Sequence, residues 1–177
     1  MNDRLIWREW LKKIILWILN LAEALTISII VHEAGHAIVA IACGAPITRF
    51  SLFSVDWGDG NFTISKLAIL YINGAGLVLI TSLPMFFIRP SLILGRFSAC
   101  YLFSTWVQLY SWILEPFFLH EWQDAAYFIM FSEVDVNVVR CISVIVGLAF
   151  TAAAIWKCSL QICNEIKSWP SLFSPIR

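Results

Sequence analysis

Residues 26–43 read TISIIVHEAGHAIVAIAC, and this stretch decides the fold. Outside His32, Glu33 and His36 it is almost wholly apolar, and apolar residues continue upstream to about Ile14. Because about 20 apolar residues can cross a bilayer as a helix, we expect a membrane span over 14–43. Gly44-Ala45-Pro46 then ends the helix. The start of this region, 5–19, is amphipathic, and we expect it to lie in the membrane interface.

The composition agrees with a membrane protein. Of the 177 residues, 60% are hydrophobic and 14% are charged, whereas a soluble domain has about 45–50% and about 25%. A chain this short cannot bury so much apolar surface in a core, so lipid is the expected solvent. The formal net charge of +0 gives no sign of nucleic-acid binding. We expect a single membrane-embedded domain over 1–177.

Three further apolar runs follow, at about 67–88, 94–119 and 138–160, and a short apolar piece lies at 125–131. Between the first two spans, residues 47–65 alternate apolar and polar side chains around Asp59-Gly60. Asp-Gly between alternating runs is typical of a β-hairpin. The sequence therefore predicts an all-α membrane protein with four transmembrane helices and a small β-hairpin after the first.

The charged residues predict the orientation of this multi-pass integral membrane protein. We expect the N-terminal segment to stay in the protein, because Asp3 and Glu9 interrupt the basic region that a signal peptide needs. With four spans both termini share one side of the membrane, and that side holds nine of the 12 lysines and arginines. Cytoplasmic loops are enriched in these residues, so we expect both termini in the cytoplasm.

The segment His32-Glu33-Ala34-Gly35-His36 is an HExxH sequence. Residues four apart share one face of a helix, so both imidazoles can bind one Zn²⁺ ion. Glu33 is the expected general base, which takes a proton from a zinc-bound water that attacks a peptide carbonyl. Ionisable residues inside a membrane span are costly and mark functional sites. The alternative is a buried polar cluster that only packs helices together.

The motif, its apolar flanks and the predicted hairpin resemble the site-two protease family of intramembrane zinc metalloproteases. The resemblance covers about 32–131. It implies hydrolysis of peptide bonds in or near transmembrane segments of membrane-protein substrates, within the lipid bilayer. It also implies a third zinc ligand, an aspartate from a later membrane helix. The candidates after the second span are Glu115, His120, Glu121, Asp124, Glu133 and Asp135.

Asp124 is the expected third ligand, because it opens the apolar piece 125–131 and falls toward the same membrane side as the HExxH motif. The family has Asp-Gly at this point, whereas this chain has Asp124-Ala125. His120 and Glu121 remain neighbouring alternatives, and Asp124 would otherwise be a helix N-cap. Asn73 matches an asparagine that the family is thought to use near its substrate, although the proline of that motif is absent. Otherwise Asn73 is a polar residue that packs helices.

Two other classes of function stay open at this point. A non-proteolytic membrane zinc-binding or scaffold protein would bind the metal without any turnover that depends on Glu33. A transporter or channel would be favoured by inverted repeats, and the sequence shows none.

Overall fold

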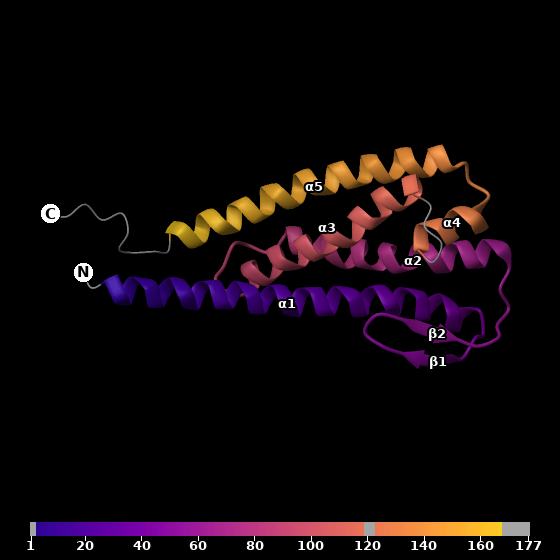
Figure 1. Ribbon diagram of the computed structural model, residues 1–177, viewed down its shortest axis with the longest axis horizontal. Coiled ribbons are helices and arrows are strands. Elements are labelled where there is room, and N and C mark those ends of the chain that lie inside the picture. The colour runs from indigo at the N-terminus through magenta and orange to yellow at the C-terminus, as the bar shows by residue number, and fades with distance from the viewer. Residues whose placement is uncertain (1–2, 119–122, 168–177) are drawn as a thin grey trace.

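The computed structural model describes residues 3–118 and 123–167, and within them the chain is mostly helical. The long helices run side by side, the start of α1 and the end of α5 lie at one end of the molecule, and the small sheet lies at the other (Figure 1). The elements are α1 (Asp3–Ala42), β1 (Ile47–Phe50), β2 (Val55–Trp57), α2 (Ile64–Ser82), the 3-10 helix η1 (Leu83–Phe86), α3 (Leu94–Phe118), α4 (Asp124–Ser132) and α5 (Val136–Lys167).

Helix α1 runs for 40 residues and includes both the predicted interfacial segment and the predicted first span. At about 1.5 Å per residue it is about 60 Å long, roughly twice the thickness of the hydrocarbon core. The helix is followed by Gly44, whose φ of 77° is a left-handed conformation that glycine adopts without strain. The Gly44 N–H donates to the Ile41 carbonyl at 2.9 Å, so the last turn closes before the strands begin.

The predicted hairpin is present, but its turn is not at Asp59-Gly60. Strand β1 pairs antiparallel with β2, and a short loop containing Ser51 and Ser54 connects them. The Ser51 N–H and hydroxyl both donate to the Ser54 carbonyl, at 2.8 and 3.0 Å, and stabilise this turn. The segment after β2 folds back on the end of α1 instead, where the Asn61 N–H donates to the Cys43 carbonyl at 2.8 Å.

Helix α3 packs against α1 and against α5, and it is buried along much of its length. Its Leu102 packs with Phe150 and Ala154 of α5. Its buried serine and threonine hydroxyls donate to carbonyls of their own helix, as Ser104 does to Cys100 at 3.1 Å. These small polar side chains are therefore satisfied inside the bundle.

A buried ion pair joins α5 to α3 at the end of the bundle away from the hairpin. Arg96 donates to the Glu165 carboxylate, at 2.8 Å from Nε and 3.1 Å from Nη2. Trp17 of α1 and Gln161 of α5 donate to the same carboxylate. Because Arg96 is 5% exposed and Glu165 is 3% exposed, each charge depends on the other for its solvation.

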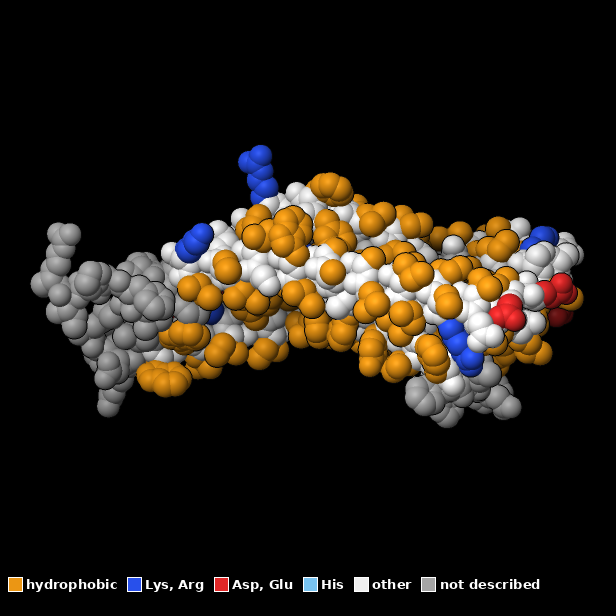
Figure 2. Space-filling model, turned by 90° about the horizontal axis from the view of Figure 1, so that it is seen from above, with side chains coloured by type: hydrophobic (Ala, Val, Ile, Leu, Met, Phe, Trp, Pro, Cys, Tyr) orange, Lys and Arg blue, Asp and Glu red, His pale blue; other side chains and the backbone are white. Residues whose placement is uncertain are grey.

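Helices α1, α2 and α5 are long and apolar enough to cross a membrane, over Trp7–Ala42, Ile64–Phe86 and Val136–Lys167. The predicted run at 94–119 corresponds, over its described residues, to the 25-residue helix α3, but a fourth such span is not confirmed among the described residues. Helix α3 contains Arg96 and several hydroxyl groups, which a lipid-facing helix would exclude. It can contain them because it packs between other helices and buries these side chains. Hydrophobic side chains cover the middle of the face in Figure 2, with most charged ones toward the ends.

Candidate metal centre

Helix α1 presents His32 and His36 on one face, one turn apart, as their spacing predicts. Their Nε2 atoms are 3.1 Å apart and their ring centroids are 4.9 Å apart. His36 is 5% exposed, and His32 is partly buried. The two imidazoles therefore converge on one point between α1 and its neighbours.

Asp124, the first residue of α4, reaches the same point. Its Oδ2 lies 2.8 Å from His32 Nε2 and 3.2 Å from His36 Nε2. The N-cap of α4 is Gln123, so Asp124 does not occupy the capping position. Burial alone would raise the pKa of Asp124, but hydrogen bonds with the two imidazoles together outweigh burial and hold this pKa at about 2. The carboxyl group is therefore ionised at neutral pH.

The hydrogen-bond chemistry of this cluster fits a metal ion. His36 Nδ1 lies 2.7 Å from the Leu70 carbonyl, which only accepts, so the proton of a neutral His36 is on Nδ1. Its Nε2 then directs a lone pair at an ionised carboxylate, and the two repel unless a proton or a metal ion lies between them. Ligand atoms around a tetrahedral zinc ion are about 3.3 Å apart, because each lies about 2.0–2.1 Å from the metal. The three distances in this cluster are 2.8, 3.1 and 3.2 Å.

Glu33 lies in the cleft beside this cluster. The cleft has a volume of about 370 Å³ and is walled by α1, the hairpin, α2, α3 and α4. Val55 and Trp57 of β2 line the same cleft as Glu33. The hairpin therefore forms one wall of the cleft that Glu33 lines. The residues that line the cleft are His32, Glu33, His36, Phe53, Ser54, Val55, Trp57, Tyr71, Ser111, Gln123 and Asp124.

Two glycines allow α1 and α2 to approach closely enough to complete the site. A Cβ on Gly35 would lie 2.5 Å from the Asn73 carbonyl oxygen, and a Cβ on Gly74 would lie 2.6 Å from His36 Nε2. Side-chain carbons do not approach other atoms this closely, so a larger residue at either position would displace a helix or an imidazole. Gly74 is not among the predicted site residues, and its only sequence signal is the run of small residues at 74–76.

The predicted substrate residue, Asn73, lies at the same helix contact. Its Nδ2 donates to the Gly35 carbonyl at 2.7 Å, so its side chain joins α2 to the HExxH turn. Asn73 is not among the described residues that line the cleft. The substrate-binding role of Asn73 stays a prediction.

The other candidate ligands do not join the cluster within the described chain. Glu133 and Asp135 lie at the junction between α4 and α5, and the described metal-ligating cluster contains only His32, His36 and Asp124. His120 and Glu121 fall outside the described residues, and so does the side chain of Glu115.

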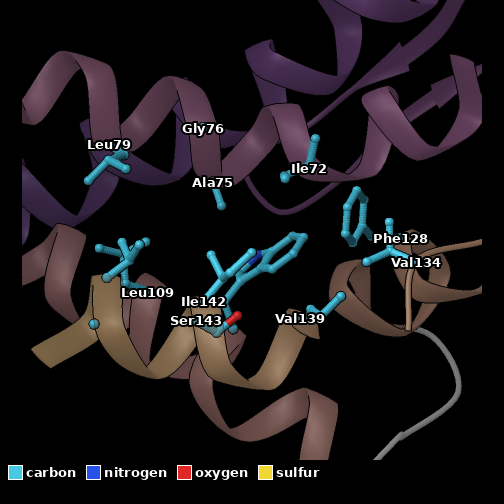
Figure 3. A pocket seen from close by; sticks show the side chains of 13 residues that line it. Ile72, Ala75, Gly76, Leu79, Leu109, Phe128, Val134, Val139, Ile142 and Ser143 are labelled. Atoms are coloured by element: carbon cyan, nitrogen blue, oxygen red, sulfur yellow. The ribbon is translucent and has the colours of Figure 1, made fainter. Parts of the chain in front are cut away.

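A second cavity, of about 340 Å³, lies between α2, α3, α4 and α5 (Figure 3). Its lining is hydrophobic except for Ser143 and contains no titratable side chain among the described residues. Ala75, Trp112 and Ala125 pack together as a buried cluster beside it. Since the chain neighbours of Trp112 and Ala125 line the metal cleft, this cluster separates the two cavities. The second cavity therefore supplies no acid, base or metal ligand.

The fold and the site together define a helical protein with three candidate membrane-spanning helices among its described residues and a candidate metal centre between the helices. The model of Peptidase family M50, the site-two protease family, matches residues 20–153, a range that includes the HExxH motif and Asp124. The chain therefore belongs to this family, and the resemblance in the sequence is confirmed. No curated protein and no solved structure matches the chain.

Proposed function

We propose that the protein is an intramembrane zinc metalloprotease that hydrolyses peptide bonds in or near the transmembrane segments of membrane-protein substrates. The main support is the convergence of ligand atoms from His32, His36 and Asp124 within 4.8 Å of one another, in one cleft with Glu33. Two imidazoles and one carboxylate suit a catalytic zinc, which has three protein ligands and one open position. Membership of Peptidase family M50 supports the same activity.

Zinc bound here would activate water and polarise the scissile carbonyl. His32, His36 and Asp124 hold the metal, and the Leu70 carbonyl keeps the His36 ring turned so that Nε2 faces the site. Glu33 accepts a proton from the attacking water and passes it to the leaving amine.

The substrate backbone is expected to bind beside β2 as an extended strand. A helical transmembrane segment uses its carbonyls in its own hydrogen bonds, so it must unwind before one of them can be attacked. Strand addition then supplies new backbone partners. Val55 and Trp57 of β2 line the cleft, and no other described strand besides β1 pairs with β2.

In the bilayer, α3 is expected to act as a fourth crossing beside α1, α2 and α5. It has 25 residues and lies among the other long helices (Figure 1). Four crossings place both termini on one side, and the distribution of lysine and arginine favours the cytoplasm for that side.

The test of this function is Glu33→Gln. The amide keeps the size of the side chain but cannot accept a proton, so we expect full zinc content and loss of cleavage of a membrane-embedded peptide. His32→Ala is the matched variant that should lose both zinc and cleavage. Cleavage by Glu33→Gln at the wild-type rate would exclude Glu33 as the base and favour a non-proteolytic zinc-binding protein.

A further inference from the structure

The Nδ1 atoms of the two candidate zinc-binding histidines differ in their hydrogen bonds. His36 donates from Nδ1 to the Leu70 carbonyl, whereas His32 Nδ1 is buried and has no hydrogen-bond partner within 3–118 and 123–167. His32 Nε2 faces Asp124 and His36, so Nδ1 holds the proton when Nε2 binds a metal. A buried N–H without an acceptor is unfavourable, and an acceptor is therefore expected beside His32.

Gln108 of α3 supplies an acceptor that is also without a partner. Its Nε2 donates to Ser28 Oγ at 2.8 Å, while its Oε1 is buried and unpaired among the described residues. The Ser28 hydroxyl donates its only proton to the Leu25 carbonyl at 3.0 Å, so toward Gln108 its oxygen can only accept. This requirement places the Gln108 NH₂ group toward Ser28 and leaves Oε1 free to accept elsewhere.

The two unpaired atoms lie in the same part of the molecule. Ser28 is four residues before His32, so the two side chains share one face of α1, about 5–6 Å apart at Cβ. Gln108 therefore contacts the face of α1 that carries His32, one helical turn before it. In the described part of the chain, His32 Nδ1 and Gln108 Oε1 are the only buried side-chain polar atoms without a partner. One is a donor and the other is an acceptor.

We propose that Gln108 is a positioning residue that accepts the hydrogen bond of His32 Nδ1 through one bridging water molecule. The bridge keeps the His32 ring in the tautomer and orientation in which Nε2 faces the metal. A buried water needs at least two polar partners, and these two atoms provide a donor and an acceptor. The inference rests on the proposed zinc site and adds α3 to the elements that build it.

The experiment measures the zinc dissociation constant of the full chain in detergent, by competition with a chromophoric chelator. Gln108→Leu removes the acceptor and is expected to weaken zinc binding by about 10–100-fold. Gln108→Glu keeps an acceptor at this position and should bind zinc within a few-fold of wild type. Rescue by glutamate separates positioning from packing, because a carboxylate fills an apolar gap less well than leucine.

Thr105→Val is the matched control on the same helix. Its hydroxyl is buried and donates to the Tyr101 carbonyl at 3.0 Å, so its loss should leave zinc affinity unchanged. Wild-type affinity in Gln108→Leu would overturn the inference, as would equal weakening in Thr105→Val or in Gln108→Glu. If Gln108→Leu does not fold, Ser28→Ala releases the amide instead and should weaken zinc binding several-fold; unchanged affinity there also overturns the inference. Failure of the zinc site itself is distinguishable, because His32→Ala would then bind zinc as wild type does.

Discussion

Gly74→Ala tests how closely α2 must approach the two imidazoles. Its Cβ would lie 2.6 Å from His36 Nε2 and 2.8 Å from His32 Nε2, whereas ordinary contact begins at 3.4 Å. To restore ordinary contact, the His36 ring would have to move away by about 0.8 Å and the His32 ring by about 0.6 Å. Ligand distances in a metal site tolerate only about 0.2 Å. We therefore expect zinc affinity to fall at least about 100-fold, or roughly 2.7 kcal/mol, and cleavage to fall with it.

The matched control for this substitution is Gly76→Ala. It makes the same change on the same helix, and its Cβ meets nothing within 4 Å. Both variants gain about 0.5–1 kcal/mol of intrinsic helix stability, so helix propensity cannot explain a difference in zinc affinity between them. The assay is chelator competition for zinc together with thermal unfolding in detergent. Equal zinc affinity in the Gly74 and Gly76 variants would refute the close contact between α2 and the imidazoles.

Three further substitutions address the third ligand, the ion pair and the end of α1. Asp124→Ala should bring zinc content well below one ion per chain, measured by atomic absorption; full retention would point to a different third ligand. Glu165→Ala leaves Arg96 buried without its carboxylate, and we expect the free energy of unfolding in micelles to drop by about 3–5 kcal/mol. A free energy of unfolding close to that of wild type would show that the ion pair contributes little to stability. Gly44→Ala forces a left-handed φ on alanine and should destabilise the protein by about 1–2 kcal/mol with no change in zinc affinity.

The local features of the site follow from residues near one another in the chain. The apolar runs predict helices because each residue type contributes its own transfer free energy to lipid. The spacing of His32 and His36 predicts one shared face, because helix geometry repeats every few residues. The hairpin was predictable from alternation, but its turn was not. Asp59-Gly60 is a favourable turn sequence, yet the segment after β2 pairs with the end of α1 through Asn61 and Cys43, a contact between chain segments that alternation does not encode.

The sequence by itself determined the class of protein, the helix that holds HExxH and the family. It left six candidates for the third ligand, and Asp124 was singled out only with the help of the family resemblance. The meeting of His32 with Asp124, 92 residues away, was decided by the tertiary structure, as was the contact of Ser28 with Gln108, 80 residues away. The same holds for Gly74 beneath the imidazoles and for the burial of α3 among its neighbours. Helical periodicity acts over a few residues, whereas the choice of which helix faces meet depends on the packing of the whole bundle.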